Sequence, residues 1–229
     1  MSNTILAIEA SSETCSIALL SAGNVYHQQN DTPRGHAKNI LPMIESVLEQ
    51  ASIKSRDVDV IAVTNGPGAF TSVRIGVAVC QGLAAALNCP VISISSLAVL
   101  AYQAIQTSKT DSALVALDAR MDEVYFGAYR VSTNGLPESI LPDLVAKPSD
   151  IPLPQLNEPE SVSATGMGWE AYSEHMQSKF AAYELEKLDI LFPSAAYLLE
   201  IADKMYEIGK CHDVADLVPV YLRDNVVHG

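Results

Sequence analysis

Residues 65–76, with the sequence NGPGAFTSVRIG, form a glycine-rich junction between two apolar segments. The run before it, residues 58–64, is typical of a buried strand, and the pattern after it predicts a helix that begins at Thr71 or Ser72. A strand that passes through a tight turn into a helix is the repeating unit of α/β folds. The junction therefore restricts this part of the chain to an α/β arrangement.

Gly66 and Gly68 leave two interpretations of this junction open. Glycine permits backbone angles that a side chain forbids and lets another group approach closely. The hydroxyls of Thr71 and Ser72 can cap the helix start, whose free N–H groups face whatever lies in front of the loop. The loop can thus cradle a phosphate, although it lacks the lysine of a P-loop and the G-x-G-x-x-G spacing. A tight turn before a capped helix explains the same residues.

Strands and helices alternate along the rest of the chain. The first half predicts strands at 4–9, 14–20, 24–29, 58–64 and 91–94, and helices at 36–51, at 71–88 and from Ser95 or Ser96 to 104. A second lobe is expected from about residue 112, with paired strands at 113–118 and 123–131 and helices at 169–180 and 194–209. We therefore predict two units, residues 1–108 and 109–229.

The charge balance limits the partners of this chain. Its 14 basic and 27 acidic residues give a net charge of −13, whereas a protein that grips a nucleic-acid backbone unaided needs a basic surface. We expect any RNA to be held mainly by another subunit. No uninterrupted apolar run approaches the roughly 20 residues that cross a bilayer, and the first residues lack the basic start of a secretory signal. A cytoplasmic protein without membrane contact is expected.

Side chains that carry chemistry are sparse in this sequence. The five histidines stand singly, the four cysteines show no C-x-x-C spacing, and no G-x-S-x-G elbow is present. Asp118, Arg120, Asp122 and Glu123 cluster, either as an acid–base group or as an arginine paired with a carboxylate at a hairpin turn. We predict no catalytic residue and no metal ligand.

Several motifs together resemble the bacterial TsaB (YeaZ) family. GPGAFTSVRIG is followed by QGLA at 81–84, residues 5–19 resemble the family's opening strand, acidic turn and second strand, and DAR at 118–120, EVY at 123–125 and PVYLR at 219–223 fall in the family's order. The resemblance spans residues 5–223 and is densest in the first 130. It implies the actin-like ATPase fold of sugar kinases, Hsp70 and actin, in which two lobes with mixed sheets flanked by helices enclose a cleft.

The resemblance also implies a function. TsaB proteins are non-catalytic partners and activators of TsaD, which transfers a threonylcarbamoyl group to adenosine 37 of tRNAs that read codons beginning with adenine. TsaE, an ATPase, completes that assembly. TsaD holds a metal through an H-x-x-x-H pair on a helix, whereas His36 here has Ile40 four residues on. The implied protein is not an enzyme, forms a homodimer when alone, and meets tRNA only through the complex.

A nucleotide site is a weaker implication of the resemblance. No cofactor is expected to be required, but weak binding of ATP or ADP with Mg²⁺ would use Glu9, Ser11, Ser12, Gly66 and Gly68 as the phosphate loops. Glu9 stands where the family commonly carries aspartate, so a magnesium geometry built for aspartate would have to adjust. The alternative is that Glu9 caps the turn or faces solvent.

The helices at 36–51 and 71–88 are the implied interface with TsaD and between two copies. The second is apolar on almost every face, which predicts burial all round, and ordinary core packing explains the same residues. The candidate interface residues are His36, Ile40, Met43, Ile44, Val47, Val73, Arg74 and Val77.

A rival function is an independent small-molecule kinase or ATPase that uses the Glu9 turn and the loop at Gly66 and Gly68. It rests on fold analogy alone, which is a poor guide to function. A glycoprotease-like hydrolase is a second rival, but the sequence shows neither metal ligands nor nucleophile machinery for it.

Overall fold

The computed structural model describes residues 3–32, 35–156 and 161–223. Its first sheet has the strand order β3-β2-β1-β4-β5. β1 (Ile5–Glu9), β2 (Cys15–Ser21) and β3 (Asn24–Asn30) pair antiparallel, whereas β4 (Val60–Thr64) and β5 (Val91–Ile94) continue the sheet parallel to β1. Every residue of β1 and β4 is buried, as expected for central strands covered on both faces.

The second sheet repeats this topology. Its order is β10-β9-β6-β7-β8, in which β6 (Ser112–Arg120), β7 (Glu123–Val131) and β8 (Pro137–Ala146) are antiparallel, and β9 (Val162–Thr165) and β10 (Leu185–Lys187) run parallel to β6. In each sheet the first strand is central, the next two extend one side, and the last two extend the other. The two mixed sheets flanked by helices are the predicted actin-like arrangement, although the repeat is not visible by residue identity.

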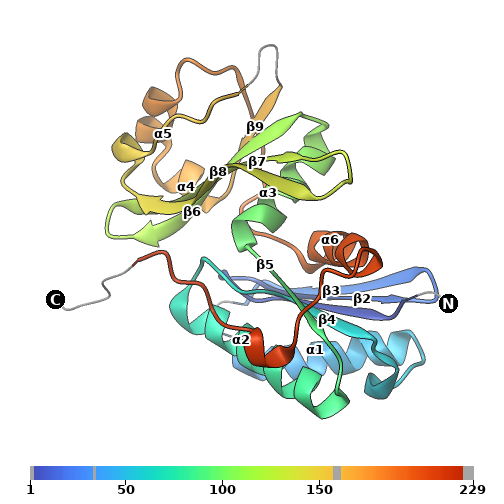
Figure 1. Ribbon diagram of the computed structural model, residues 1–229. Helices are drawn as coiled ribbons and strands as arrows, with labels where there is room; N and C mark the ends of the chain where they lie inside the picture. Colours follow the sequence, from blue (N-terminus) through green and yellow to red (C-terminus); the bar gives the residue numbers. More distant parts are fainter. Residues whose placement is uncertain (1–2, 33–34, 157–160, 224–229) are drawn as a thin grey trace.

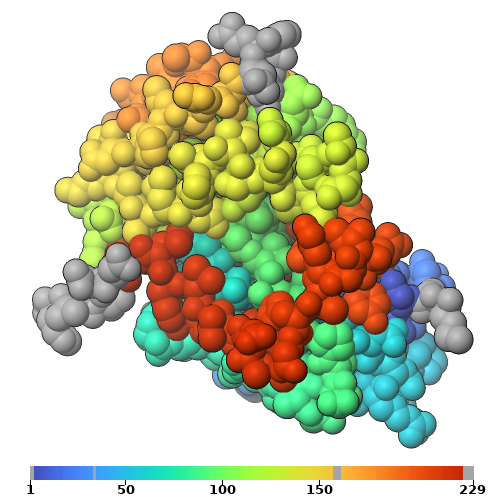
Figure 2. Space-filling model, viewed as in Figure 1, coloured from blue at the N-terminus to red at the C-terminus, as the bar shows by residue number. Residues whose placement is uncertain are grey.

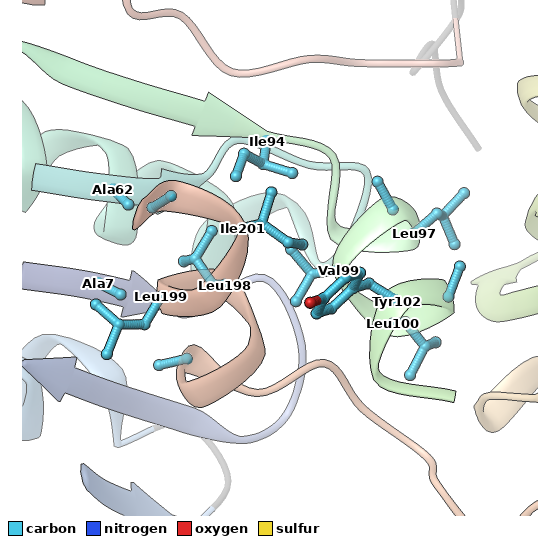
Figure 3. Packing of buried hydrophobic residues seen from close by; sticks show 14 of the residues in the cluster. Ala7, Ala62, Ile94, Leu97, Val99, Leu100, Tyr102, Leu198, Leu199 and Ile201 are labelled. Carbon is cyan, nitrogen blue, oxygen red and sulfur yellow. The ribbon is translucent and has the colours of Figure 1, made fainter. Parts of the chain in front are cut away.

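Helices form three layers around the two sheets (Figure 1). α1 (His36–Gln50) and α2 (Phe70–Leu87) cover the outer face of the first sheet, and α4 (Met167–Ala171) and α5 (Ser173–Lys179) cover the outer face of the second. α3 (Ser96–Ser108) and α6 (Ala195–Glu207) lie between the sheets in one continuous core (Figure 3). Three short 3-10 helices, Ser55–Asp57, Pro148–Asp150 and Val214–Asp216, complete the described elements.

Each of the two central helices packs on the sheet of the other predicted unit. α3 packs on β6 and β7 of the second sheet, whereas α6 packs on β1 and β2 of the first. The backbone N–H of Ala195 also donates to the Ser16 hydroxyl at 2.8 Å. A helical apolar pattern shows that a helix is buried but not which sheet it covers. The predicted division therefore keeps each helix with the strands that come before it in the sequence.

Most predicted elements are confirmed, with differences at identifiable places. Ser95 caps α3 as one of the two predicted caps. Pro42 lies within α1, which begins at His36 despite it. The predicted helix 169–180 is two short helices, and β8, β9 and β10 were not predicted. β8 carries two prolines and little regular alternation, which hides an edge strand.

α2 is not buried all round, which corrects that prediction. Its buried residues, among them Val73, Val77 and Cys80, face β4 and α1, and the opposite stripe is exposed. Within the described residues it is the helix long and apolar enough to cross a bilayer by length and composition alone. Its packing on the first sheet is that of a structural helix in an α/β layer.

The last described residues, 217–223, form an extended segment that we call the C-terminal strap. It follows α6 and a one-residue bridge between Val91 and His212, and it runs over the surface from α2 toward the second sheet (Figures 1 and 2). The Gln81 amide donates to the Leu217 carbonyl at 2.8 Å, and the N–H of Val220 donates to the Asn65 carbonyl at 2.7 Å. The strap is therefore fixed to the first lobe before it reaches the second.

Candidate functional site

A cavity of about 620 Å³ lies where the two lobes and the C-terminal strap meet. Its walls come from four places: the β1–β2 turn (residues 11–13), the start of α2 (67–70 and Val73), the β6–β7 turn (117–121), and strap residues 220–223. Apolar side chains such as Leu117, Tyr125 and Phe192 supply much of the remaining wall. The volume is within the range of small-ligand sites.

The glycine junction is closed by the chain itself. A β-carbon on Gly68 would overlap the Ser11 carbonyl oxygen, and one on Gly66, where φ is +111°, would lie 2.7 Å from the Val220 carbonyl oxygen. The N–H of Ala69 donates to the Ser11 carbonyl at 2.8 Å. The glycines are therefore required because the β1–β2 turn and the strap approach this loop closely.

The start of α2 also differs from the prediction. The helix begins at Phe70 after Ala69, and no side chain caps it. Thr71 and Ser72, the predicted caps, lie inside the first turn instead.

Glu9 is fully buried at the end of β1. Its Oε1 accepts hydrogen bonds from the Ser11 N–H at 2.8 Å and the Ser11 hydroxyl at 2.7 Å. Its Oε2 has no hydrogen-bond partner, and neither has the hydroxyl of Thr64 at the end of the adjacent strand. Burial raises the pKa of Glu9 from 4.5 to about 7, although the hydrogen bonds from Ser11 oppose the shift. Glu9 caps its own turn, as the alternative prediction had it, and does not face solvent.

These contacts test whether a magnesium nucleotide fits the turn. Ser11 is fully buried and Ser12 nearly so, and both hydrogen-bond donors of Ser11 are used by Glu9. A phosphate at this place needs free donors on the turn, and a hard cation needs a carboxylate directed toward it. The Glu9 turn and the Gly68 loop do not fit that group.

The two arginines that line the cavity are paired with carboxylates of the same chain. The Arg120 guanidinium lies 2.9 Å from the Asp118 carboxylate and 3.3 Å from that of Glu13. Arg223, at the end of the strap, pairs with Glu123 and donates to the Ala119 carbonyl at 3.1 Å. The pairing of Arg120 at a hairpin turn is confirmed, and its contact with Glu13 joins the turns of the two lobes.

The candidate interface residues divide sharply by exposure. Six of them are core side chains that pack under the first sheet: Ile40, Met43, Ile44, Val47, Val73 and Val77. His36 is also buried, with Nε2 3.0 Å from the Thr14 carbonyl oxygen. An apolar helical stripe first covers the chain's own sheet, so these seven side chains face the core of this lobe. Arg74 is exposed and stays a candidate.

The described histidines lie on different elements of the fold. His27 approaches Ser194, His212 lies 2.9 Å from the Ser93 hydroxyl, and His175 is exposed on α5, whereas His228 lies outside the described residues. Across the ranges that the structure describes, no three histidine, cysteine or acidic side chains are grouped to hold a metal. Cys15, Cys80, Cys89 and Cys211 are free, and the first two are buried.

Sequence reasoning missed how the cavity is completed. In the sequence, the PVYLR motif indicates a family resemblance and no contact with another segment. In the fold, it brings Val220 and Tyr221 against the glycine junction, about 150 residues earlier in the chain. The exposed aromatic pair of Phe70 and Tyr221, with ring centres 5.6 Å apart, was likewise not predicted.

Comparison with known proteins gives a consistent result. Residues 23–228 match the family model described as TsaD, tRNA N6-adenosine threonylcarbamoyltransferase. The chain is 35% identical to the tRNA threonylcarbamoyladenosine biosynthesis protein TsaB of Escherichia coli, over 97% of the chain and 95% of that protein. It is equally similar to TsaB of Haemophilus influenzae, with 97% and 94% covered. The solved structure of YeaZ from Pseudomonas aeruginosa superposes with a TM-score of 0.88 and 37% identity, over 96% of the chain and all of that structure.

Proposed function

The chain belongs to the TsaB (YeaZ) family of tRNA threonylcarbamoyladenosine biosynthesis proteins, and we propose that its part in that biosynthesis is to bind and activate TsaD without catalysing the transfer itself. The observation that carries this proposal is a contrast. The chain matches the TsaD family model over most of its length, yet the H-x-x-x-H pair that the resemblance assigns to TsaD is absent from the sequence.

The charged residues around the interlobe cavity give this proposal a physical basis. Its two arginines, Arg120 and Arg223, are neutralised by carboxylates of the same chain, and Glu9 is committed to Ser11. A phosphoryl- or acyl-transfer site needs charged groups free to stabilise the transition state. The chain therefore contributes a surface, and TsaD contributes the reacting groups.

The exposed stripe of α2 is the surface we assign to this contact. Phe70, Arg74, Ala78 and Gly82 follow one another at four-residue spacing and are all exposed. Small residues let another helix approach closely. We propose that TsaD covers this stripe in the complex, that a second copy covers it when the chain is alone, and that TsaE joins the assembly afterwards.

The acidic composition of the chain indicates that it does not hold the tRNA by itself. With a net charge of −13, the chain repels a phosphate backbone at physiological salt. We propose that tRNA is held by the other subunits and that the complex assembles in the cytoplasm.

Reconstituted threonylcarbamoylation tests the proposal. TsaD, TsaE, the enzyme that makes threonylcarbamoyl-adenylate, and tRNA are combined with and without this chain, and the modified nucleoside is measured by mass spectrometry. We expect product only when the chain is present. Equal product without it would refute the partner role, and product from the chain alone would refute the non-catalytic role.

Calorimetry with ATP and Mg²⁺ separates the rival kinase or ATPase. The proposal predicts no binding heat from the isolated chain, because Glu9 uses both donors of Ser11 and the Ala69 N–H is bonded to the Ser11 carbonyl. Micromolar binding with turnover would favour the independent enzyme.

A further inference from the structure

Exposed apolar side chains gather at the mouth of the interlobe cavity. The described residues include nine large hydrophobic side chains that are exposed, and four of them line this one cavity: Phe70, Met121, Val220 and Tyr221. Met121 is 75% exposed at the tip of the β6–β7 turn. Exposed apolar side chains that gather around a preformed hollow mark an interaction site.

This mouth is continuous with the exposed stripe of α2. Phe70 begins that stripe and Arg74 is the next residue along it. Tyr221 of the C-terminal strap lies against both, since its hydroxyl receives a hydrogen bond from Arg74 Nε at 2.6 Å. A partner that covers α2 therefore reaches the cavity mouth without a second, separate contact.

Arg74 gives the mouth a charge preference. Its guanidinium carbon lies 3.5 Å from the centre of the Phe70 ring and 5.4 Å from that of Tyr221, so the cation is held in place by two aromatic side chains. The structure describes five arginines, and the other four each have a carboxylate within 4.0 Å, whereas Arg74 has none among the described residues. A fixed, unpaired arginine beside an apolar hollow favours an apolar group with an anion next to it.

We propose that the interlobe cavity is the docking slot for a segment of the TsaD partner that inserts one large apolar side chain between the lobes and places an adjacent carboxylate on Arg74. This inference rests on the proposed function and deepens it. A preformed hollow filled by one anchor residue, with a charge pair at its rim, is the usual construction of a binding hot spot. The acidic charge of the chain disfavours RNA as the occupant.

Two substitutions test the slot, each with a matched control. Ala171→Trp fills the cavity from its exposed wall, and Ala181→Trp places the same side chain on another exposed position. Arg74→Glu reverses the charge at the rim, and Arg56→Glu makes the same change of net charge at a distant exposed site. Because all four positions are exposed, the fold and its melting temperature should be retained in each variant.

The measurement is the Kd for purified TsaD by calorimetry, with oligomeric state followed by light scattering. We expect Ala171→Trp and Arg74→Glu each to weaken binding at least tenfold and the two controls to change it less than twofold. Wild-type affinity in both test variants would overturn the slot and leave the proposed function standing. Failure of the wild-type chain to bind TsaD at all would refute the proposed function, and the slot with it. Loss of self-association only, with TsaD binding unchanged, would assign the slot to a second copy and also overturn the inference.

Photo-cross-linking identifies the chemistry of the occupant. A benzophenone amino acid at position 121, in the exposed turn, should cross-link to a TsaD segment that carries a large apolar residue beside Asp or Glu. A cross-linked segment without that pair, or a cross-link to tRNA in place of protein, would contradict the inference.

Discussion

Glu9→Gln should remove a pH dependence of stability that this buried carboxyl imposes. In the folded chain the pKa of Glu9 is raised to about 7 from 4.5, because burial penalises the ionised form. The proton is therefore bound more tightly in the folded state than in the unfolded one. Stability from this group is greatest below pH 4.5, falls as the pH rises toward 7, and is constant above.

The magnitude follows from the shift. A difference of about 2.5 between the two pKa values, at about 1.4 kcal/mol for each pKa unit, amounts to about 3.5 kcal/mol of unfolding free energy lost between pH 4.5 and 8. Glutamine keeps an oxygen for the Ser11 donors and offers an N–H to the unpaired Thr64 hydroxyl. The variant should be close to wild type at pH 4.5 and about 3.5 kcal/mol more stable at pH 8.

Urea unfolding at several pH values, followed by circular dichroism and by the fluorescence of Trp169, measures the difference. Subtracting wild type from variant at each pH cancels the other titrating groups. Glu49→Gln on the exposed face of α1 is the control and should change stability by less than about 0.5 kcal/mol at any pH. A Glu9→Gln difference that does not vary with pH would refute the reasoning, since Glu9 would then ionise at its ordinary pKa.

Three further substitutions address the packing around the cleft. Gly68→Ala should lower the free energy of unfolding by about 2 kcal/mol or more, measured by thermal or urea unfolding, because the added β-carbon overlaps the Ser11 carbonyl. Gly82→Ala has open space around it and should stabilise α2 by about 0.5–1 kcal/mol. Equal effects of the two substitutions would contradict the conclusion that the β1–β2 turn packs directly on the Gly68 loop. Asp143→Ala removes the acceptor shared by the Ser95 and Tyr129 hydroxyls and should cost about 1–3 kcal/mol in the same assay, while Asp143→Asn, which keeps an acceptor, should cost less. Arg223→Gln should speed amide hydrogen exchange in the β6–β7 turn and leave β1 and β4 unchanged, because the strap holds that turn through Ala119 and Glu123; unchanged exchange in the turn would show that the strap does not hold it.

Local patterns predicted the first lobe well, for physical reasons. The strands predicted at 24–29 and 91–94 and the helix starting at His36 are bounded by turn residues and carry clear periodicity, which are signals confined to a few neighbouring residues. β8 lacks such signals, and helix 169–180 is divided at Tyr172, where the backbone leaves the helical region. Which sheet α3 and α6 cover depends on contacts between distant segments, which no local window contains.

The candidate site was harder to predict because its defining contacts are long-range. The role of Glu9 depends on burial and on Ser11, and only the turn itself was visible in the sequence. The interface prediction chose the apolar positions of α1 and α2, which the first sheet already covers. Exposed apolar residues such as Phe70 and Tyr221 can be distinguished from core residues only once the fold shows which faces remain uncovered.

The repeated topology is one physical argument for our proposal that this cleft binds a protein partner and not a nucleotide. β1 and β6 are equivalent central strands, and each carries an acidic residue at or near its end, Glu9 in one lobe and Asp118 in the other. In both turns the carboxylate accepts the backbone N–H two residues further on, from Ser11 at 2.8 Å and from Arg120 at 2.8 Å. An N–H used in this way cannot also bind a phosphate. Both lobes have thus satisfied these donors internally in the same manner. The cavity between them has largely apolar walls and arginines that are paired with carboxylates, and Arg74, beside Phe70 and Tyr221 at its mouth, has no carboxylate partner among the described residues.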